Sequence, residues 1–235
     1  YLKKIIDAKD TDFIKVITGM KRTGKSTLLL MFRDYLLANG EKEENIVHIN
    51  FESAKYDDIK DYKDLYKYIE DNYKDFYDFV NGKITKDKKY YVFLDEVQTV
   101  PLFQKAVDGL YIKKNVDVYI TGSNAYLLSS ELSTLLSGRY IEIKMYPLSF
   151  KEFLVFNNYD ENNLEEKFNE YLKYGGLPAI TLIKGNDELI LSYLNDIYNT
   201  IVKKDIIDRN NIKDVALLEN IIKYDRPTKV KGSLG

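Results

Sequence analysis

The sequence contains no cysteine, no tryptophan and a single histidine, His48, among its 235 residues. These absences exclude thiolate catalysis, cysteine-ligated zinc, iron–sulfur clusters and disulfide scaffolds. A Ser-His-Asp triad would have to use His48. No apolar run approaches the roughly 18 residues that span a bilayer, and no signal peptide opens the chain. We therefore expect a soluble, cytoplasmic protein that makes no membrane contact.

Neither sign of charge dominates the chain. Lysine and arginine number 35 against 37 aspartates and glutamates, which gives a formal net charge of −2. The chain as a whole is thus not a basic nucleic-acid-binding protein, although a local basic patch is not excluded. At about 150 residues per domain, the length allows one large domain or two small ones, with a core that needs no metal or disulfide.

Tyrosine is abundant, with 21 residues, and several of them lie between Ile59 and Val80. Apolar residues recur there every three or four positions, which predicts one amphipathic helix that ends at Asn81-Gly82. Such an aromatic stripe can serve as a base-stacking surface. We interpret it instead as the core-facing side of a helix.

Short apolar segments alternate with helical ones along the first two thirds of the chain. The predicted strands are residues 13–18, 46–51, 90–94, 116–120 and 140–145. Strands that alternate with helices predict an α/β fold with a parallel, doubly wound sheet. Beyond Pro147 only helical segments follow, at residues 150–156, 164–174, 178–183 and 187–203.

The segment from Gly19 to Ser26 fits the pattern G-x-x-x-x-G-K-[ST] and joins a predicted strand to a predicted helix. In such a loop the backbone N–H groups and the helix dipole bind phosphate oxygens. Lys25 supplies a charge to the β and γ phosphates, and Ser26 offers a hydroxyl to Mg²⁺. The pattern predicts a nucleoside triphosphate site. Its expected binding residues are Gly19, Lys21, Arg22, Thr23, Gly24, Lys25, Ser26 and Thr27.

Two carboxylates, Asp95 and Glu96, follow the most continuously apolar strand. A carboxylate at the end of a buried strand is costly unless it is paired or near a metal. We expect Asp95 to hold Mg²⁺ together with Ser26, and Glu96 to activate the attacking water. The second acid disfavours a small-molecule kinase, and the missing Asn-Lys-x-Asp motif argues against a GTPase.

The strand at residues 116–120 is followed by Thr121-Gly122-Ser123-Asn124. Asn124 or Ser123 is expected to contact the γ-phosphate or the attacking water; a capping role in a strand-to-helix turn is the alternative. Glu52, at the end of the second strand, is a second candidate for tuning hydrolysis. His48 has apolar neighbours and is interpreted as a core residue rather than a ligand.

These motifs resemble those of the AAA+ and related ATPases, and in particular the bacterial and archaeal AAA+-like ATPases that carry a C-terminal domain of unknown function. The resemblance runs in order through Gly19–Ser26, Asp95–Pro101, Thr121–Asn124, Gly138–Tyr140, Pro147–Phe153, Gly175–Pro178 and Lys204–Arg209. It implies a five-stranded parallel sheet in the order 5-1-4-3-2 and a small helical lid, with ATP and Mg²⁺ as cofactors. We expect a nucleotide-binding core over residues 1–147, the lid over 148–208, and a linker or the start of a truncated C-terminal domain over 209–235.

The resemblance assigns two further residues. Arg139 stands where these ATPases keep an arginine finger, which reaches the γ-phosphate of a neighbouring subunit in a homo-oligomer; a local ion pair is the alternative. Pro178, in Gly175-Gly176-Leu177-Pro178, is similar to a lid element that contacts the nucleotide. Ordinary helix punctuation is the alternative for this segment. The lid arginine of many AAA+ proteins is absent, which favours a signalling-type switch over a processive motor.

Taken together, the motifs predict Mg²⁺-dependent binding of ATP and slow hydrolysis that drives a conformational switch. One rival is a scaffold that binds ATP or ADP with little hydrolysis and regulates a partner domain; others are a small-molecule phosphotransferase and a DNA-dependent motor. The chain begins at Tyr1 rather than Met, and little of it follows Arg209. We therefore expect a fragment of a longer protein whose missing C-terminal part binds a protein or nucleic-acid partner.

Overall fold

The computed structural model describes residues 1–83, 88–113, 115–123, 138–183, 185–203, 207 and 212–224. Five strands form one all-parallel sheet in the order β2-β3-β4-β1-β5. Read from the other edge, this is the predicted order 5-1-4-3-2, which the structure confirms. The strands are β1 (Ile14–Gly19), β2 (Ile46–Asn50), β3 (Tyr90–Asp95), β4 (Val116–Ser123) and β5 (Tyr140–Met145).

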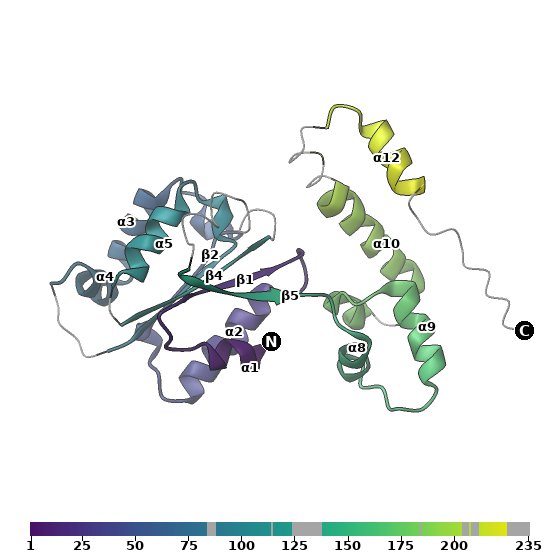
Figure 1. Ribbon diagram of the computed structural model, residues 1–235, viewed down its shortest axis with the longest axis horizontal. Coiled ribbons are helices and arrows are strands. Elements are labelled where there is room, and N and C mark those ends of the chain that lie inside the picture. The colour runs from purple at the N-terminus through teal and green to yellow at the C-terminus, as the bar shows by residue number, and fades with distance from the viewer. Residues whose placement is uncertain are drawn as a thin grey trace, which may run out of the picture. The chain divides into compact units, whose positions relative to one another are not determined.

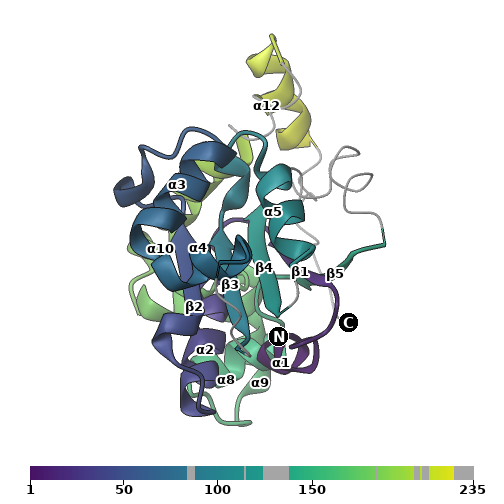
Figure 2. The same cartoon turned by 90° about the vertical axis from the view of Figure 1, so that its left-hand side faces the viewer.

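Helices cover both faces of the sheet (Figure 1, Figure 2). One face carries α3 (Tyr62–Asn72), α4 (Lys74–Val80) and α5 (Phe103–Tyr111), and the other carries α1 (Leu2–Asp7) and α2 (Lys25–Ala38). Single helical turns lie at η1 (Glu43–Asn45), η2 (Ala54–Tyr56) and η3 (Val97–Thr99). Strand β3 is buried along its whole length because both of its faces are covered, which explains its continuous apolar sequence.

Strand β4 is three residues longer than predicted. Thr121, Gly122 and Ser123, expected as a turn, continue the strand and pair with Ile17, Thr18 and Gly19 of β1. The reason is that β1 itself runs on to Gly19, so its parallel neighbour keeps a hydrogen-bonding partner to the same point.

The single helix predicted from Ile59 to Val80 is wrong. The structure has two helices, α3 and α4, separated at Tyr73, whose backbone leaves the helical region at φ −131° and ψ 56°. The Tyr73 hydroxyl donates to the carbonyl of His48 at 3.5 Å, and after the break Phe76 packs against Tyr90 with ring centres 5.3 Å apart. Tertiary contacts therefore override the regular apolar spacing.

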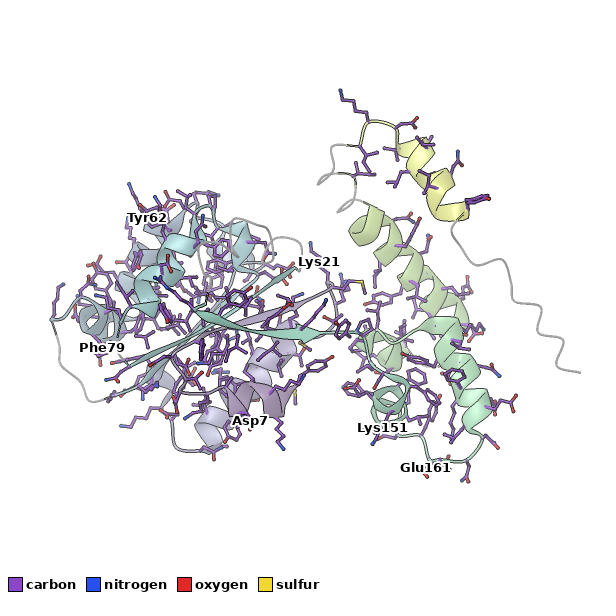
Figure 3. All side chains as sticks on the ribbon, in the orientation of Figure 1. Asp7, Lys21, Tyr62, Phe79, Lys151 and Glu161 are labelled. Atoms are coloured by element: carbon purple, nitrogen blue, oxygen red, sulfur yellow. The ribbon has the colours of Figure 1, made fainter. Side chains whose placement is uncertain are left out.

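The tyrosine-rich face is confirmed as core. Tyr62 and Phe79 lie on α3 and α4 over the sheet (Figure 3), and both are among the partly buried residues that pack against the apolar core. Tyr90, Tyr91 and Tyr119, in the strands, are almost completely buried.

An ion pair lies buried near the amino ends of the strands. Lys15, with no exposed surface, pairs with Asp117 and also donates to the carbonyl of Thr11 at 3.0 Å. Asp117 in turn accepts from the Tyr119 hydroxyl at 2.7 Å and from the Asp10 N–H at 2.9 Å. Burial lowers the pKa of Lys15, and the charge of Asp117 opposes this shift. The pair ties the segment before β1 to the start of β4.

Strand β5, paired with β1 at the end of the sheet order, alternates in character. Ile143 and Met145 are buried, whereas Glu142 and Lys144 are exposed. Glu142 accepts a hydrogen bond from the buried hydroxyl of Thr18 at 2.5 Å. The strand is thus half-buried, with its polar positions directed to one side.

The remaining elements are helical, as predicted. They are α8 (Phe150–Phe156), α9 (Leu164–Tyr174), η4 (Pro178–Ile183), α10 (Asp187–Ile197), η5 (Tyr198–Lys203) and α12 (Val215–Tyr224). The helix expected over residues 187–203 is α-helical only to Ile197, and η5 is a π-helix. By contacts, the chain forms one compact unit from Tyr1–Asn162 with Gly175–Pro178, and a second from Asn163–Tyr174 with Ala179–Gly235. The division at residues 147 and 208 stays a prediction.

Candidate functional site

The loop between β1 and α2 fits tightly over the end of the sheet. A Cβ atom on Gly19 would lie 2.7 Å from the carbonyl oxygen of Met145, so glycine is required where β1 meets β5. Gly24 has a left-handed φ of 95°, and α2 begins at the next residue. The buried Thr23 hydroxyl closes the loop by donating to the carbonyl of Met20 at 2.8 Å. A loop that leads in this way into a helix N-terminus offers free N–H groups to an anion.

The other predicted residues of the loop are more accessible. Ser26 is half-buried in the first turn of α2, and the neighbouring Thr27 is exposed. Lys21 is half-buried and lies beyond the end of β1 (Figure 3), while Arg22 is exposed with a left-handed φ of 67°. A ligand can therefore approach the loop from solvent on this side.

Lys25 is 4% exposed and is held at the centre of the site. Its ammonium donates to the carbonyls of Gly19 at 3.3 Å and Met20 at 3.4 Å. It also forms an ion pair with Glu96, with 3.2 Å between Nζ and Oε1. The lysine and the second acid, which lie 71 positions apart in the sequence, are therefore in direct contact.

Asp95 ends β3 with no exposed surface. Its Oδ1 accepts a hydrogen bond from the Thr121 hydroxyl. Its Oδ2 is buried and has no hydrogen-bond partner in the part of the chain that the structure describes. A buried carboxylate oxygen without a donor is costly, so this atom suits a metal ion or metal-bound water.

Glu96 adopts a left-handed backbone, with φ 55°, immediately after the strand. This turn directs its side chain to two partners: Lys25, on Oε1, and Gln98, whose amide nitrogen donates to Oε2 at 2.6 Å. The Glu96 N–H donates to the Thr121 hydroxyl at 2.9 Å, and its carbonyl accepts from Thr99 at 3.1 Å. Glu96 is thus fixed through both its side chain and its backbone.

Thr121 joins the two acids. Its hydroxyl, which is buried in β4, accepts from the backbone of Glu96 and donates to the carboxylate of Asp95. The site therefore combines a loop for phosphate, one ammonium group and two differently held carboxylates. Chemically, this set can bind a polyphosphate, hold a divalent cation and take a proton from water.

The remaining polar candidates near these strand ends differ in position. Ser123 pairs in register with Gly19, at the start of the phosphate loop, whereas Asn124 lies outside the described residues. Glu52 is exposed, and its N–H donates to the side chain of Asn50, which pairs in register with Asp95. His48 packs edge-on against Phe93 and is half-buried.

Arg139 lies at the opposite end of the sheet from the loop. Its carbonyl accepts from the N–H of Ile14, the first residue of β1, whereas the loop follows the last. The length of β1, about 16 Å, therefore separates Arg139 from the phosphate site of its own chain. The guanidinium is about half exposed, lies 3.6 Å from a carboxylate oxygen of Asp108 and is placed over the ring of Tyr111. The structure thus shows the local ion pair that was the alternative to a finger.

Pro178 begins η4 and is half-buried. The segment before it is attached to the residues that follow β5, because the Leu148 N–H donates to the carbonyl of Gly176 at 2.7 Å. A Cβ atom on Gly176 would lie 2.2 Å from the Leu148 carbonyl oxygen, so this close approach requires glycine. Pro178 therefore starts a helix as expected of helix punctuation, and its contact with nucleotide stays a prediction.

Comparison with known proteins assigns the family. The sequence model of an AAA domain family matches residues 11–154. The chain belongs to this AAA+-like P-loop ATPase family. An uncharacterized protein of Haemophilus influenzae is 44% identical to this AAA domain protein over 226 residues, which are 95% of the chain and 54% of the relative. The uncharacterized protein MJ1544 of Methanocaldococcus jannaschii is 32% identical over 226 residues, or 89% of the chain and 46% of the relative.

The chain thus spans about half the length of these two relatives. Among solved structures, AMPPCP-bound DnaA from Aquifex aeolicus is similar with a TM-score of 0.47 and 16% identity, over 88% of this chain and 65% of that one. A DNA polymerase III gamma subunit-related protein from Thermotoga maritima is similar with a TM-score of 0.47 and 15% identity, over 91% and 67% of the two chains.

Two residues of this AAA domain were not predicted as part of the site, Thr121 and Gln98. Thr121 opens the Thr-Gly-Ser-Asn segment, and its place directly after the strand predicted at residues 116–120 was the available signal. Gln98 stands two positions after Glu96, and its contact depends on the left-handed turn at Glu96. Neither the turn nor the contact can be seen in the residue pattern alone.

Proposed function

We propose that this AAA domain binds ATP with Mg²⁺ and hydrolyses it slowly, and that the change of bound nucleotide acts as a conformational switch. The observation that carries the proposal is the contact between Lys25 and Glu96, 3.2 Å apart, beside Oδ2 of Asp95, for which the described residues supply no hydrogen-bond donor. A phosphate-binding lysine, a metal-binding acid and a candidate base converge at one end of the sheet.

Each residue has a distinct role in this proposal. The loop N–H groups bind the phosphates, and Lys25 exchanges its contact with Glu96 for one with phosphate. That exchange frees the Glu96 carboxylate to accept a proton from the attacking water. Because Glu96 is also bonded to Thr121 in β4 and to Gln98, its movement changes the contacts of two neighbouring segments.

The residues fit a magnesium ion. No group of three or more histidine and acidic side chains that suits a metal gathers among the described residues. Mg²⁺ needs only one or two protein oxygens, since it keeps water and phosphate ligands. Asp95 and Ser26 would supply these oxygens, and the ion would neutralise charge on the phosphates.

The test compares Glu96→Gln with the wild-type chain. We expect Glu96→Gln to bind ATP within a few-fold of wild type while phosphate release falls by about 100-fold or more, since the base is lost and the shape is kept. Glu44→Gln, an exposed glutamate that pairs with Lys88, is the matched control and should behave as wild type. Turnover is measured by phosphate release and binding by calorimetry.

Unchanged turnover in Glu96→Gln would contradict the role of this residue. ATP binding without any phosphate release from the wild-type chain would instead support the nucleotide-gated scaffold. Assembly through Arg139, and a protein or nucleic-acid partner, stay predictions. Within the described residues, none of the helices has both the length and the apolar character that crossing a membrane requires.

A further inference from the structure

The two ends of the Gln98 side-chain amide differ: the nitrogen has a hydrogen-bond partner, and the oxygen has none in the described part of the chain. Its amide nitrogen lies 2.6 Å from Oε2 of Glu96 and donates to it. Its carbonyl oxygen Oε1 is buried and has no hydrogen-bond partner among the residues that the structure describes. The carboxylate fixes the orientation of the amide, because Oε2 can accept a hydrogen bond only from the nitrogen.

We propose that Gln98 is a second catalytic residue, whose carbonyl oxygen accepts a hydrogen bond from the attacking water while its nitrogen holds Glu96. This inference rests on the proposed function and deepens it. The two ends of one carboxamide lie side by side, so an oxygen bonded to Gln98 is also within reach of the Glu96 carboxylate. A water has two protons, and the pair of residues offers an acceptor for each.

The contact with Lys25 explains why a second partner is needed. In this structure Glu96 has Lys25 on Oε1 and Gln98 on Oε2. When Lys25 binds phosphate, its ion pair with Glu96 is broken. The hydrogen bond from Gln98 is then the one of these two contacts that the Glu96 carboxylate keeps. Gln98 therefore keeps the carboxylate in position during the step that needs it.

The chemical step balances without any further reagent. The water oxygen forms a bond to the γ-phosphorus, the bond from that phosphorus to the bridging oxygen breaks, and ADP leaves with the bonding electrons. Glu96 takes one proton from the water. Gln98 gives and takes no proton and acts by orientation alone, as a glutamine does for the attacking water in small GTPases.

A double-mutant cycle separates a direct contact with water from an effect that passes only through Glu96. The variants are Gln98→Ala, Glu96→Gln and the two combined, with Gln104→Ala on α5 as the matched glutamine control. For each we measure single-turnover hydrolysis and the affinities for ADP and for ADP with aluminium fluoride, which imitates the transferring phosphoryl group with its in-line water.

We expect Gln98→Ala to lower the hydrolysis rate by about 10- to 100-fold and to leave ADP affinity within twofold of wild type. It should also lose most of the extra affinity that aluminium fluoride confers. Combined with Glu96→Gln, it should lower rate and fluoride-complex affinity further than Glu96→Gln alone. Gln104→Ala should match wild type.

Three results would overturn the inference. A Gln98→Ala rate within twofold of a wild-type chain that hydrolyses ATP would overturn it and leave the proposed function intact. A double variant no slower than Glu96→Gln would show that Gln98 acts only through Glu96 and does not contact the water. Absence of turnover in the wild-type chain would overturn both proposals together.

Discussion

Protonation of the His48 side chain makes the stability of the fold depend on pH. Burial lowers the pKa of its imidazole below the usual value near 6.5, against the opposing charge of Asp95, and its buried Nε2 has no partner within the described part of the chain. The folded state therefore favours neutral imidazole, and between the two pKa values the unfolded chain binds more protons. Stability contributed by this residue is complete above the unfolded pKa and falls as pH drops through 6.5 towards the folded value.

We expect His48→Phe, which keeps a ring against Phe93, to remove this part of the pH dependence. Unfolding by urea, measured at steps from about pH 5 to about pH 8, should show a shallower loss of stability on the acidic side in the variant than in wild type. Carboxylates titrate in both proteins, so the difference between the two curves isolates His48, the one histidine in the sequence. Parallel curves would contradict the lowered pKa.

Among single residues, those of the site that could be predicted are the ones that belong to a local sequence motif. Lys25, Asp95 and Glu96 follow from a loop motif and from acids at the end of an apolar strand. The bonds from Thr121 and Gln98 to these acids depend on a left-handed turn at Glu96 and on the pairing of β3 with β4. Tertiary geometry of this kind has no signature in residue spacing.

At the scale of elements, two glycines with similarly little space for a Cβ atom are expected to differ in how much stability they lose on substitution by alanine. A Cβ on Gly176 would lie 2.2 Å from the backbone carbonyl of Leu148, and one on Gly109 would lie 2.3 Å from the hydroxyl of Tyr66. A hydroxyl at the end of a side chain can move, whereas the Leu148 backbone is held by its bond to Gly176.

Gly176→Ala should therefore lower the free energy of unfolding by about 1–3 kcal/mol. Gly109→Ala, in the last turn of α5, should stay within about 1 kcal/mol of wild type, because the gain in helix propensity offsets the displacement of Tyr66. Chemical denaturation of the two variants beside wild type measures both values. Equal losses would show that the connection at Leu148 adjusts as easily as a side chain.

The elements themselves were largely predictable because the strands are short segments rich in β-branched and aromatic residues, and consecutive parallel strands need a crossover between them. The break between α3 and α4 was not. Tyr73 fits the apolar spacing of one helix, yet its hydroxyl donates to the carbonyl of His48 in a strand distant in sequence. A bond of this kind is absent from any local pattern.

At the scale of the whole molecule, the position of Arg139 bears on assembly. It lies at the amino ends of the strands, and its own phosphate loop lies at their carboxyl ends. If Arg139 serves a phosphate, as the family resemblance implies, that phosphate belongs to another subunit. The prediction is tested by mixing Arg139→Ala, which keeps an intact loop, with Lys25→Ala, which keeps an intact arginine.

Each variant alone should release little phosphate, and the mixture should exceed the sum of the two, because one subunit of each kind completes a shared site. Arg33→Ala, whose arginine pairs with the exposed Glu43, is the control and should retain wild-type turnover. The prediction is contradicted if the mixture is no more active than its separate parts and Arg139→Ala alone is fully active. Arg139 would then have only the structural role of its ion pair with Asp108.

The alternation along β5 has a consequence for solubility. A strand at the end of a sheet presents backbone groups that another chain can pair with, and flat apolar edges of this type seed aggregation. Glu142 and Lys144 place opposite charges on the exposed side of β5, in alternation with the buried Ile143 and Met145. Edge-to-edge stacking of two such strands in the same direction would set like charges against each other. Ile143 and Met145 thus complete the core, while the charged residues that alternate with them discourage the growth of a continuous sheet between molecules.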